Sequence, residues 1–422
     1  MKRLQGRESL EERNVKRPLG QGSLEEKREE MARTGIFGGE NVKKQQGPAA
    51  PAKNHMKHRQ GKDACEGGDL LRLAAKQFGV DQPFVPAGHG HINDTYVSED
   101  GCFVLQRINT EVFRDPAALM DNIDAVTSHL RHKGLLLGED VRHTVLNFYR
   151  TKDGALFAEE QGRYYRMARF IQDSVVIEPG SCGADDLREC GLGFGRFLDR
   201  LSDFDASVLT ETIPDFHNTP KRIRDLWDAA RQDPFGRAAE TGSELDFVRQ
   251  YEDRISLITD GLAEGSIPLC VTHNDTKINN ILFDAGSRRA LCVIDLDTVM
   301  PGSRLCDYGD ALRTAAATAA EDEADLSRVG VNMRAVRAFT EGFLEETGEV
   351  LAPRERELLP ASFLLMTLEC GVRFLEDYLR GDVYFKTDRP GHNLDRARNQ
   401  FEMVRKIDGL QQEMAAMIRG LS

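Results

Sequence analysis

The chain has 422 residues, 40% of them hydrophobic, which is enough for a large core and for two domains or lobes. Its formal net charge is −13, but residues 1–62 carry a balance of +7 and the remainder a balance of −20. An acidic body argues against a dedicated nucleic-acid-binding protein, which needs a basic face. It leaves room for a small phosphorylated ligand, which needs only a local positive site.

The first 66 residues differ in composition from the rest. They are rich in Gly, Lys, Arg, Glu and Gln, and they contain a rough repeat, QGRESLEER at 5–13 and QGSLEEKREE at 21–30. Such a segment has too little apolar surface to offset its chain entropy, so we expect a disordered tail or a frayed helix over 1–66. A partner-binding or regulatory arm is the alternative.

From about Gly68 the pattern becomes globular, and its first part, 67–168, is predicted to be a β-rich lobe. The turn sequence SEDG separates two β-rich runs, which indicates a hairpin. Asp115 is placed to cap a helix that starts at Pro116. The predicted elements are a helix over 69–80, strands over 92–98 and 102–108, a helix over 115–132, and strands over 141–149 and 163–171.

The remainder, 169–422, is predicted to be mostly helical. Two short β-like runs, 281–283 and 291–296, interrupt the helices. The sequence therefore predicts an α+β fold with two lobes, and a polar cluster at 271–284 lies where they join. The predicted helices cover 184–202, 219–231, 243–263, 306–318, 331–347, 354–380 and 392–419.

Eight cysteines occur, at 65, 102, 182, 190, 270, 292, 306 and 370. They form no CxxC pair, and no Cys/His spacing indicates zinc. We expect reduced, buried thiols in runs such as LCVID. We also expect no membrane helix, which needs about 20 apolar residues, and no secretory signal. These features predict a cytoplasmic protein.

The polar cluster reads VTHNDTKINNILFD and fits the pattern His-x-Asp-x4-Asn. Transfer of a phosphoryl group to a hydroxyl needs a carboxylate at the acceptor and hard oxygen ligands for Mg²⁺. Asp275 suits the first role and Asn280 the second. His273 is expected to brace the loop through its hydrogen bonds.

A second carboxylate follows within twenty residues, in the run LCVIDLDT. Asp295 comes at the end of a predicted strand and is the first choice for Mg²⁺, with Asp297 the second. Either residue taken alone would be better explained as part of a turn after the strand. The combination with the His-x-Asp-x4-Asn pattern favours a metal site.

A glycine loop, AGHGHINDTY, lies in the β-rich lobe at 87–96. Gly88 and Gly90 would let backbone N–H groups approach a phosphate, and Asn93 stands where a third glycine is usual. A plain hairpin turn is the alternative interpretation.

Three segments, HNDTKINN, VIDLDTVMPGSRLCDYGDALR and RFLEDYLRGDVYFKT, resemble the aminoglycoside phosphotransferase and choline kinase superfamily. Within it, the chain looks most similar to the N-acetylhexosamine 1-kinases, from about Gln77 to about Val404. The resemblance implies a protein-kinase-like bilobal fold. It also implies phosphorylation of the anomeric hydroxyl of N-acetylglucosamine or N-acetylgalactosamine, with ATP and Mg²⁺.

By residue-for-residue match, the resemblance implies that Asp275 is the catalytic carboxylate and that Asn280 and Asp295 hold the metal. It implies that Asp307 steadies the loops and that Arg373 binds the sugar. A helix-surface charge is the alternative for Arg373.

Two tyrosines, Tyr378 and Tyr384, could form an aromatic wall for a sugar ring, and core packing is the alternative for at least one of them. The segment YYRMARFI at 164–171 resembles a hinge. Its backbone near Met167–Arg169 is expected to meet adenine.

The phosphate-binding cation is the least defined part of the predicted site. Protein kinases carry a lysine on the third strand, paired with a glutamate on the next helix. The corresponding strand here reads FVLQR, and its register decides whether Gln106 or Arg107 faces the nucleotide. The next helix offers Asp121 or Asp124, and Lys277 is a further candidate cation.

The expected partners are an amino sugar and ATP, without nucleic acid or membrane, in a monomer or weak homo-oligomer. One rival is a kinase of the same fold for choline, a methylthioribose-like sugar or an amino alcohol, whose cationic forms would need an aromatic and acidic cage. Another is a non-catalytic nucleotide-binding protein, which would be expected to lack Asp275, Asn280 or Asp295. A metal-dependent hydrolase is a third, and the sequence contains no HExxH cluster to support it.

Overall fold

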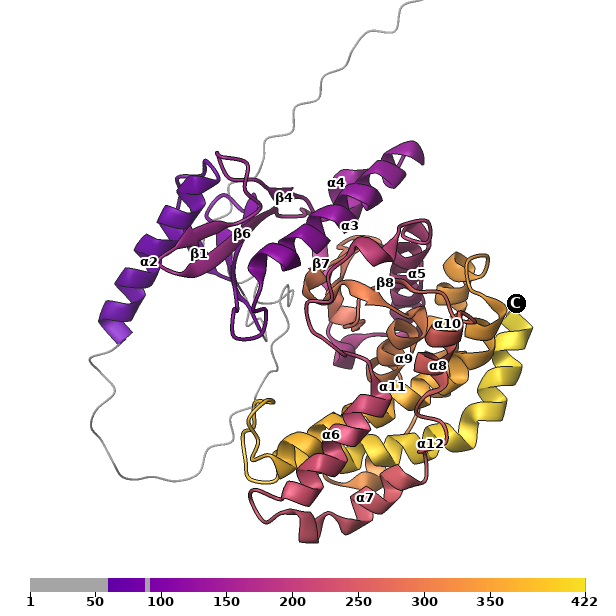
Figure 1. The fold of residues 1–422 in the computed structure, drawn as a ribbon. Coiled ribbons are helices and arrows are strands. Elements are labelled where there is room, and N and C mark those ends of the chain that lie inside the picture. Colours follow the sequence, from indigo (N-terminus) through magenta and orange to yellow (C-terminus); the bar gives the residue numbers. More distant parts are fainter. Residues whose placement is uncertain (1–59, 88–91, 422) are drawn as a thin grey trace, which may run out of the picture.

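The computed structural model describes residues 60–87 and 92–421, with side chains from residue 68 onward. Residues 1–59, most of the predicted tail, lie outside this range, as do Gly88 and Gly90. The described chain is α+β, with a β-rich N-terminal lobe and a helical C-terminal lobe, so the predicted fold class is confirmed (Figure 1).

The N-terminal lobe is built on an antiparallel sheet with the order β1-β2-β3-β6-β4, and β5 also pairs with β6. The predicted hairpin is confirmed as β2 and β3, joined by the SEDG turn. Helix α2 covers one face of the sheet, where its Ala74 and Ala75 pack with Leu105, Tyr165 and Met167. The strands are β1 (Phe84–Pro86), β2 (Asp94–Ser98), β3 (Phe103–Ile108), β4 (Phe148–Tyr149), β5 (Ala158–Glu160) and β6 (Arg163–Arg169), and α2 spans Gln60–Gln77.

The opposite face of this sheet is turned toward the helical lobe, and we call it the interlobe face. The register pairs Val104 with Ala168 and Gln106 with Arg166, and successive side chains alternate between faces. These four side chains therefore lie on the interlobe face. Val97, paired with Val104, and Phe148, paired with Ala168, lie there too.

Helix α3 (Pro116–Leu136) follows β3 and packs between the sheet and the helical lobe. Its predicted N-cap is confirmed, because Asp115 accepts hydrogen bonds from the N–H groups of Ala117 and Ala118. The strand predicted over 141–149 is mostly wrong. Asp140 caps a helical turn, α4 (Val141–Thr144), and only β4 is extended.

The helical lobe contains the predicted helices, with one difference. The helix predicted over 243–263 is two helices, because turns fill the stretch between residues 250 and 256. Figure 1 shows α12 running beside α11. The helices are α5 (Ala184–Arg200), α6 (Thr219–Gln232), α7 (Gly242–Arg249), α8 (Leu257–Glu264), α9 (Arg304–Ala315), α10 (Met333–Thr347), α11 (Pro353–Leu379) and α12 (His392–Leu421).

Short strands frame the predicted catalytic loop. A three-stranded sheet has the order β10-β9-β7, and β8 pairs with β11 in a two-stranded ribbon. The loop joins β8 to β9, so paired strands hold both of its ends. These strands are β7 (Ser174–Val176), β8 (Cys270–Thr272), β9 (Ile281–Asp284), β10 (Ala290–Val293) and β11 (Met300–Gly302).

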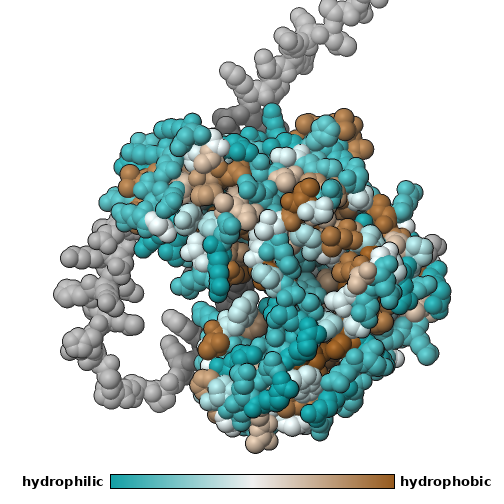
Figure 2. Space-filling view, viewed as in Figure 1, coloured by the Kyte–Doolittle hydropathy of each residue, from teal (hydrophilic) through white to brown (hydrophobic). Residues whose placement is uncertain are grey.

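We expected no apolar stretch long enough to cross a membrane, but helix α11 is such a stretch. By length and composition, α11 could cross a membrane, but 83% of its apolar window is buried inside the protein. Figure 2 shows that mostly hydrophilic side chains cover the visible face of the molecule. The burial of α11 identifies it as a core helix of the C-terminal lobe.

Candidate active site

His273 holds the start of the catalytic loop from a fully buried position. Its Nδ1 accepts a hydrogen bond from the N–H of Asp275 (3.2 Å), and its Nε2 lies 2.8 Å from the carbonyl oxygen of Ile294, to which it donates. Phe194 and Phe197 contact the ring edge-on. Because both ring nitrogens are engaged, His273 braces the loop and is not available as a base.

Asp307, at the start of α9, also holds the start of the catalytic loop. Its carboxylate accepts the N–H groups of His273 (2.8 Å) and Asn274 (2.7 Å), and its carbonyl accepts the hydroxyl of Thr276 (2.6 Å). Asn274 has φ +65°, a left-handed conformation that asparagine tolerates better than most residues. Its side chain donates to the carbonyl of Thr298 (2.8 Å), which ties the catalytic loop to the next loop.

Gly309 lets α9 approach α11 closely. A Cβ at this position would lie 2.4 Å from the carbonyl oxygen of Ser362 and 2.7 Å from the side chain of Met366. Only glycine permits this contact between the two helix backbones. The packing places Asp307 and Asp310, one turn apart on α9, beneath the catalytic loop.

Asp275 lies between a cation and an amide. Its Oδ1 is 2.7 Å from Nζ of Lys277, and its Oδ2 accepts a hydrogen bond from Nδ2 of Asn280 at 3.0 Å. Burial by itself would raise the pKa of Asp275, but the charge and hydrogen bond of Lys277 outweigh it and lower the pKa to about 2. The carboxylate is therefore an ionised hydrogen-bond acceptor at neutral pH.

Asp295 follows β10 and also has a left-handed backbone, with φ 58°. Its side chain is exposed, yet the surrounding protein removes part of its water. This loss of water, and then the charges of Asp297 and Asp275, raise the pKa of Asp295 to about 7. The charges of Arg166 and Lys277 oppose the shift without cancelling it.

Asp297 is held by side chains of the N-terminal lobe. Its Oδ1 forms an ion pair with Arg166, and its Oδ2 accepts a hydrogen bond from Asn93. Lys277 pairs with Asp275. Of the three carboxylates Asp275, Asp295 and Asp297, only Asp295 has no ion pair with a described side chain.

The structure places Gln106, and not Arg107, on the interlobe face. Arg107 lies on the other face and pairs with Asp94 at the surface. Of the two alternatives, a nucleotide-binding Arg107 does not fit this placement, because the sheet separates Arg107 from the loop that carries Asp275. The acids of α3 also do not pair with Arg166, since Asp124 pairs with Arg150 (2.7 Å) and Arg166 with Asp297.

The oxygen atoms of Asn280 and Asp295 suit a divalent ion. The amide nitrogen of Asn280 donates to the carbonyl and carboxylate of Asp275, which leaves its amide oxygen for another partner. Within the described ranges, no group of three or more His, Cys, Asp or Glu side chains could hold a metal. Two oxygen ligands fit Mg²⁺, which keeps several waters and takes others from substrate phosphates.

Arg373, on α11, lies among three aromatic rings. Its guanidinium carbon is 5.3 Å from the ring centroid of Phe216, 5.7 Å from that of Tyr384 and 5.5 Å from that of Phe385. Across the part of the chain that the structure describes, Arg373 forms no ion pair with a carboxylate. Tyr378, the other predicted aromatic wall, is buried and bonds to Glu240, so core packing explains it.

A buried acid lies one turn before Arg373. Glu369 accepts hydrogen bonds from the hydroxyl of Thr219 (2.6 Å) and from Nδ1 of His217 (2.8 Å). The Nε2 of His217 is buried and has no partner among the described atoms. The ring of His217 packs on Phe216 at 4.7 Å, so this nitrogen belongs to the region around Arg373.

At the C-terminal end of β6, the backbone groups that the hinge prediction assigns to adenine are already hydrogen-bonded. Met167 points to the α2 face of the sheet, where it is fully buried. The N–H of Arg169 donates to the carbonyl of Asn147, and that of Phe170 to the carbonyl of Cys102, both at 2.9 Å. A purine at this edge would therefore find free N–H donors only beyond Phe170.

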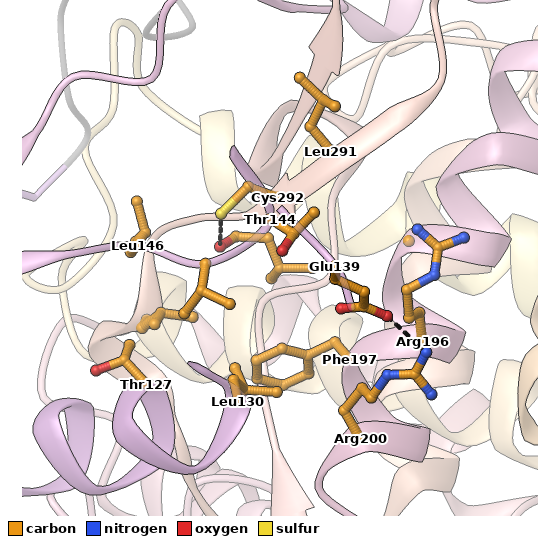
Figure 3. Close-up of a pocket in the computed structure, with 14 residues that line it drawn as sticks. Thr127, Leu130, Glu139, Thr144, Leu146, Arg196, Phe197, Arg200, Leu291 and Cys292 are labelled. Carbon is orange, nitrogen blue, oxygen red and sulfur yellow. Dashed lines mark hydrogen bonds and ion pairs between the residues drawn. The ribbon is translucent and has the colours of Figure 1, made fainter. Parts of the chain in front are cut away.

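A small cavity lies between α3, α5 and β10 (Figure 3). Leu130, Phe197 and Cys292 line it, and Arg200 bonds to Glu139 at its edge (2.7 Å). Its volume of about 40 Å³ has room for one or a few waters, and none for a nucleotide or a sugar. None of the predicted catalytic or metal-binding residues lines this cavity.

Comparison with known proteins decides the family. The model of the phosphotransferase enzyme family matches residues 83–339, which is more than half of the chain. The chain belongs to this phosphotransferase family. The matched range contains the catalytic loop, Asp295, Asp307 and the whole N-terminal sheet.

Solved structures agree on the fold of this phosphotransferase. A microcompartment-associated aminopropanol kinase superposes with a TM-score of 0.55 at 15% identity, covering 82% of this chain and 98% of its own. An aminoglycoside phosphotransferase from Alicyclobacillus acidocaldarius gives 0.53 at 12% identity, covering 89% and 98%. An amicoumacin kinase gives 0.50 at 12% identity, covering 82% and 93%. The predicted protein-kinase-like bilobal fold is thereby confirmed.

Sequence reasoning missed several residues of this phosphotransferase site. Arg166 was visible as a cation alternating with apolar residues in YYRMARFI, a pattern that indicates a charged side chain on a buried face. Phe216, His217 and Glu369 carry no comparable signal, since only the packing of α11 against the segment before α6 brings them together.

Proposed function

We propose that this phosphotransferase transfers the γ-phosphate of ATP to the anomeric hydroxyl of an N-acetylhexosamine, giving the sugar 1-phosphate. The observation that carries the proposal is Arg373, a cation among aromatic rings that forms no ion pair with a described carboxylate, although the charge of Glu369 reaches it. Its fork of N–H donors suits the ring oxygens and acyl oxygen of a neutral sugar.

The charged side chains around α9 and α11 connect this arginine to Asp275. The pKa of Lys277 is raised first by Asp275 and also by Asp310, and the charges of Arg373, Arg313 and Asp310 all reach the thiol of Cys370. We infer from these shared neighbours that Arg373 and Asp275 face one polar region. An acceptor oxygen at Asp275 would leave the rest of the sugar near Arg373 and the unpartnered nitrogen of His217.

Asp275 is suited to orient the acceptor hydroxyl and to take its proton. As the acceptor oxygen bonds to the γ-phosphorus, the bond from phosphorus to the β,γ-bridging oxygen breaks and ADP leaves. A carboxylate with so low a pKa is a weak base, which fits a transition state in which positioning and electrostatics provide most of the rate. Lys277, 2.7 Å from Asp275, is suited to contact the transferring phosphoryl group.

Asn280 and Asp295 are the residues that would hold Mg²⁺. When bound, the metal would offset the negative charge of the phosphates. The solved amicoumacin kinase contains AMP-PNP and Ca²⁺, which supports the use of a nucleotide and a divalent ion here. The apolar part of the interlobe face, Val97, Val104, Phe148 and Ala168, offers a surface for a purine.

The rival acceptor is a cationic amino alcohol, as the name of the aminopropanol kinase suggests. At 15% identity, that similarity supports the fold and not the acceptor. A protonated amine would bring a second positive charge next to Arg373, which favours a neutral acceptor.

The deciding experiment is the phosphorus NMR spectrum of the product formed from Mg-ATP and a panel of acceptors. N-acetylglucosamine, N-acetylgalactosamine, choline, ethanolamine and aminopropanol are compared. We expect an anomeric phosphate signal from one or both sugars. Turnover of only an amino alcohol would support the rival, and absence of turnover with every acceptor would contradict a kinase function.

Arg373→Met is expected to raise the KM for the sugar about 10–100-fold, because a hydrogen bond to a charged group is worth about 1.5–3 kcal/mol. The KM for ATP should stay within about twofold. Arg380→Met is the matched control, because Arg380 ends the same helix and bonds to Glu376 (2.8 Å), and its kinetics should not change. Equal changes in both KM values would contradict the role of Arg373.

A further inference from the structure

We propose that Arg166 is the positioning residue that fastens the N-terminal sheet to the metal-binding loop, and that Asp297 is its anchor and not a metal ligand. In protein kinases the cation of the N-terminal sheet lies on the third strand and pairs with the phosphates. Here the buried cation of the sheet lies on β6 and pairs with Asp297 of the helical lobe. The inference rests on the proposed use of Mg²⁺ and nucleotide.

The first observation is that the N-terminal lobe occupies both oxygens of Asp297. Arg166 pairs with Oδ1 and Asn93 donates to Oδ2, while the other end of the Asn93 side chain accepts the N–H of Asn109 (2.9 Å). The side chains of Arg166 and Asp297 are 2% and 5% exposed. Because Asp297 is enclosed by these partners, we infer that a metal would reach it only by displacing one of them.

The second observation is that Arg166 is itself fixed in place. Its Nε donates to Oε1 of Gln106 (2.9 Å), and Nε2 of Gln106 donates to the hydroxyl of Thr95 (3.1 Å). Phe148 lies 5.6 Å beneath the guanidinium. A planar group with several donors can bond to Gln106 and Asp297 together, whereas a lysine offers one nitrogen to both.

The third observation is the place of Asp297 in the chain. It lies in the single helical turn Leu296–Thr298, directly after Asp295 with its left-handed backbone. Asn122 of α3 also donates to the carbonyl of Val299 at the end of this turn (3.1 Å). Because the turn is short, fixing Asp297 fixes the backbone that carries Asp295.

These contacts explain why the two neighbouring acids differ. Arg166 and Asn93 occupy Asp297, and Asp295 keeps its oxygens for a metal. Arg166 would then affect metal binding indirectly, by fixing the turn that follows Asp295. Direct contact with a phosphate is the competing role, and the burial of Arg166 argues against it.

The test measures ADP binding by calorimetry, with Mg²⁺ and again with EDTA, for Arg166→Met, Asp297→Asn and the double variant. We expect Arg166→Met to weaken binding at least about tenfold with Mg²⁺ and less than about threefold with EDTA. The double variant should bind ADP no more weakly than Arg166→Met, because both substitutions break the same ion pair. Arg107→Met is the matched control, a surface arginine on the neighbouring strand, and should match the wild type.

Circular dichroism and thermal unfolding accompany each measurement, because Arg166→Met leaves a buried carboxylate without its cation. The double variant removes both charges and keeps the test available if the single variant does not fold. Arg166→Lys should recover part of the Mg²⁺-dependent binding.

Three results would overturn the inference. Arg166→Met could behave like Arg107→Met, or lose equal affinity with and without Mg²⁺, which would indicate direct phosphate contact. Asp297→Asn could weaken Mg²⁺-dependent binding further in the Arg166→Met background, which would make Asp297 a ligand. A wild-type protein that binds no ADP would instead overturn the proposed function, and this inference with it.

Discussion

Asp275 and Asp295 carry the same side chain, but their neighbours shift the two pKa values in opposite directions. Lys277 and Asn280 keep Asp275 ionised with a pKa of about 2, whereas burial and two nearby acids raise the pKa of Asp295 to about 7. Groups pushed apart in this way commonly serve different roles in one site. Under the proposed function, this difference would separate an acceptor-binding carboxylate from a metal-binding one.

Asp275→Asn is expected to fold and to bind nucleotide, but to lose about 10²–10⁴-fold in kcat, the usual contribution of a positioned acid or base. The amide keeps an oxygen near the acceptor but cannot take its proton. Turnover is measured by coupled ADP release at saturating substrates. Asp284→Asn is the control, because Asp284 only caps the turn at Ser287, and near-normal turnover of Asp275→Asn would contradict its assigned role.

The raised pKa of Asp295 predicts a pH dependence of metal binding. Its pKa rises from an ordinary 3.8 to about 7, so the group holds a proton below pH 7 that Mg²⁺ must displace. Apparent Mg²⁺ affinity should therefore fall several-fold from pH 8 to pH 6. Calorimetry with Mg²⁺ and ADP, corrected for protonation of free ADP, measures this, and a flat profile would contradict it.

The raised pKa of Asp295 also predicts how the free energy of unfolding of the metal-free protein changes with pH. A carboxylate whose folded pKa is raised favours the folded state below its ordinary pKa, and this contribution is lost as pH rises from about 4 to about 7. Mg²⁺ should restore stability above pH 7, where the ionised group can bind it.

At the scale of elements, local signals were sufficient where they were strong. The Asp115 cap and the SEDG turn were read correctly, because each acts through neighbouring residues. The stretch 141–149 was misread, since alternating polarity there comes from one helical turn followed by β4. The break between α7 and α8 was also missed, because residues 243–263 continue an amphipathic pattern across the turn.

Gly309→Ala tests whether the close packing of α9 on α11 supports the site. The added methyl group would meet a backbone carbonyl at 2.4 Å, so we expect a loss of about 1–3 kcal/mol in the free energy of unfolding. We also expect lower kcat, because α9 carries Asp307. Denaturant unfolding and steady-state kinetics measure the two effects.

Gly409→Ala is the matched control for that substitution. Gly409 lies inside α12, and a Cβ there would meet nothing within 4 Å. Helix propensity alone should stabilise this variant, by up to about 1 kcal/mol. A Gly309→Ala protein as stable as Gly409→Ala would contradict the packing argument.

At the scale of the whole molecule, the sequence predicted the two lobes but not the link between them. Gln106 and Arg107 are adjacent, and only the pairing of β3 with β6 shows which one faces the helical lobe. The ion pair from Arg166 to Asp297 joins residues 131 positions apart. Such contacts depend on sheet register and lobe placement, which single-sequence patterns do not contain.

A site divided between two lobes should couple ligand binding to the stability of the whole chain. The proposed site takes a purine surface from the N-terminal sheet and metal ligands from the C-terminal lobe, so bound Mg-nucleotide would contact both. Ligand at 100 times its Kd stabilises the folded state by about 2.7 kcal/mol. We therefore expect Mg²⁺ and ADP together to raise the Tm more than the sum of their separate effects.

EDTA should remove the excess, and so should Asp295→Asn, whereas Arg107→Met should keep it. A Tm shift from ADP that is the same with and without Mg²⁺ in the wild type would show that Asn280 and Asp295 do not form a metal site linked to the nucleotide.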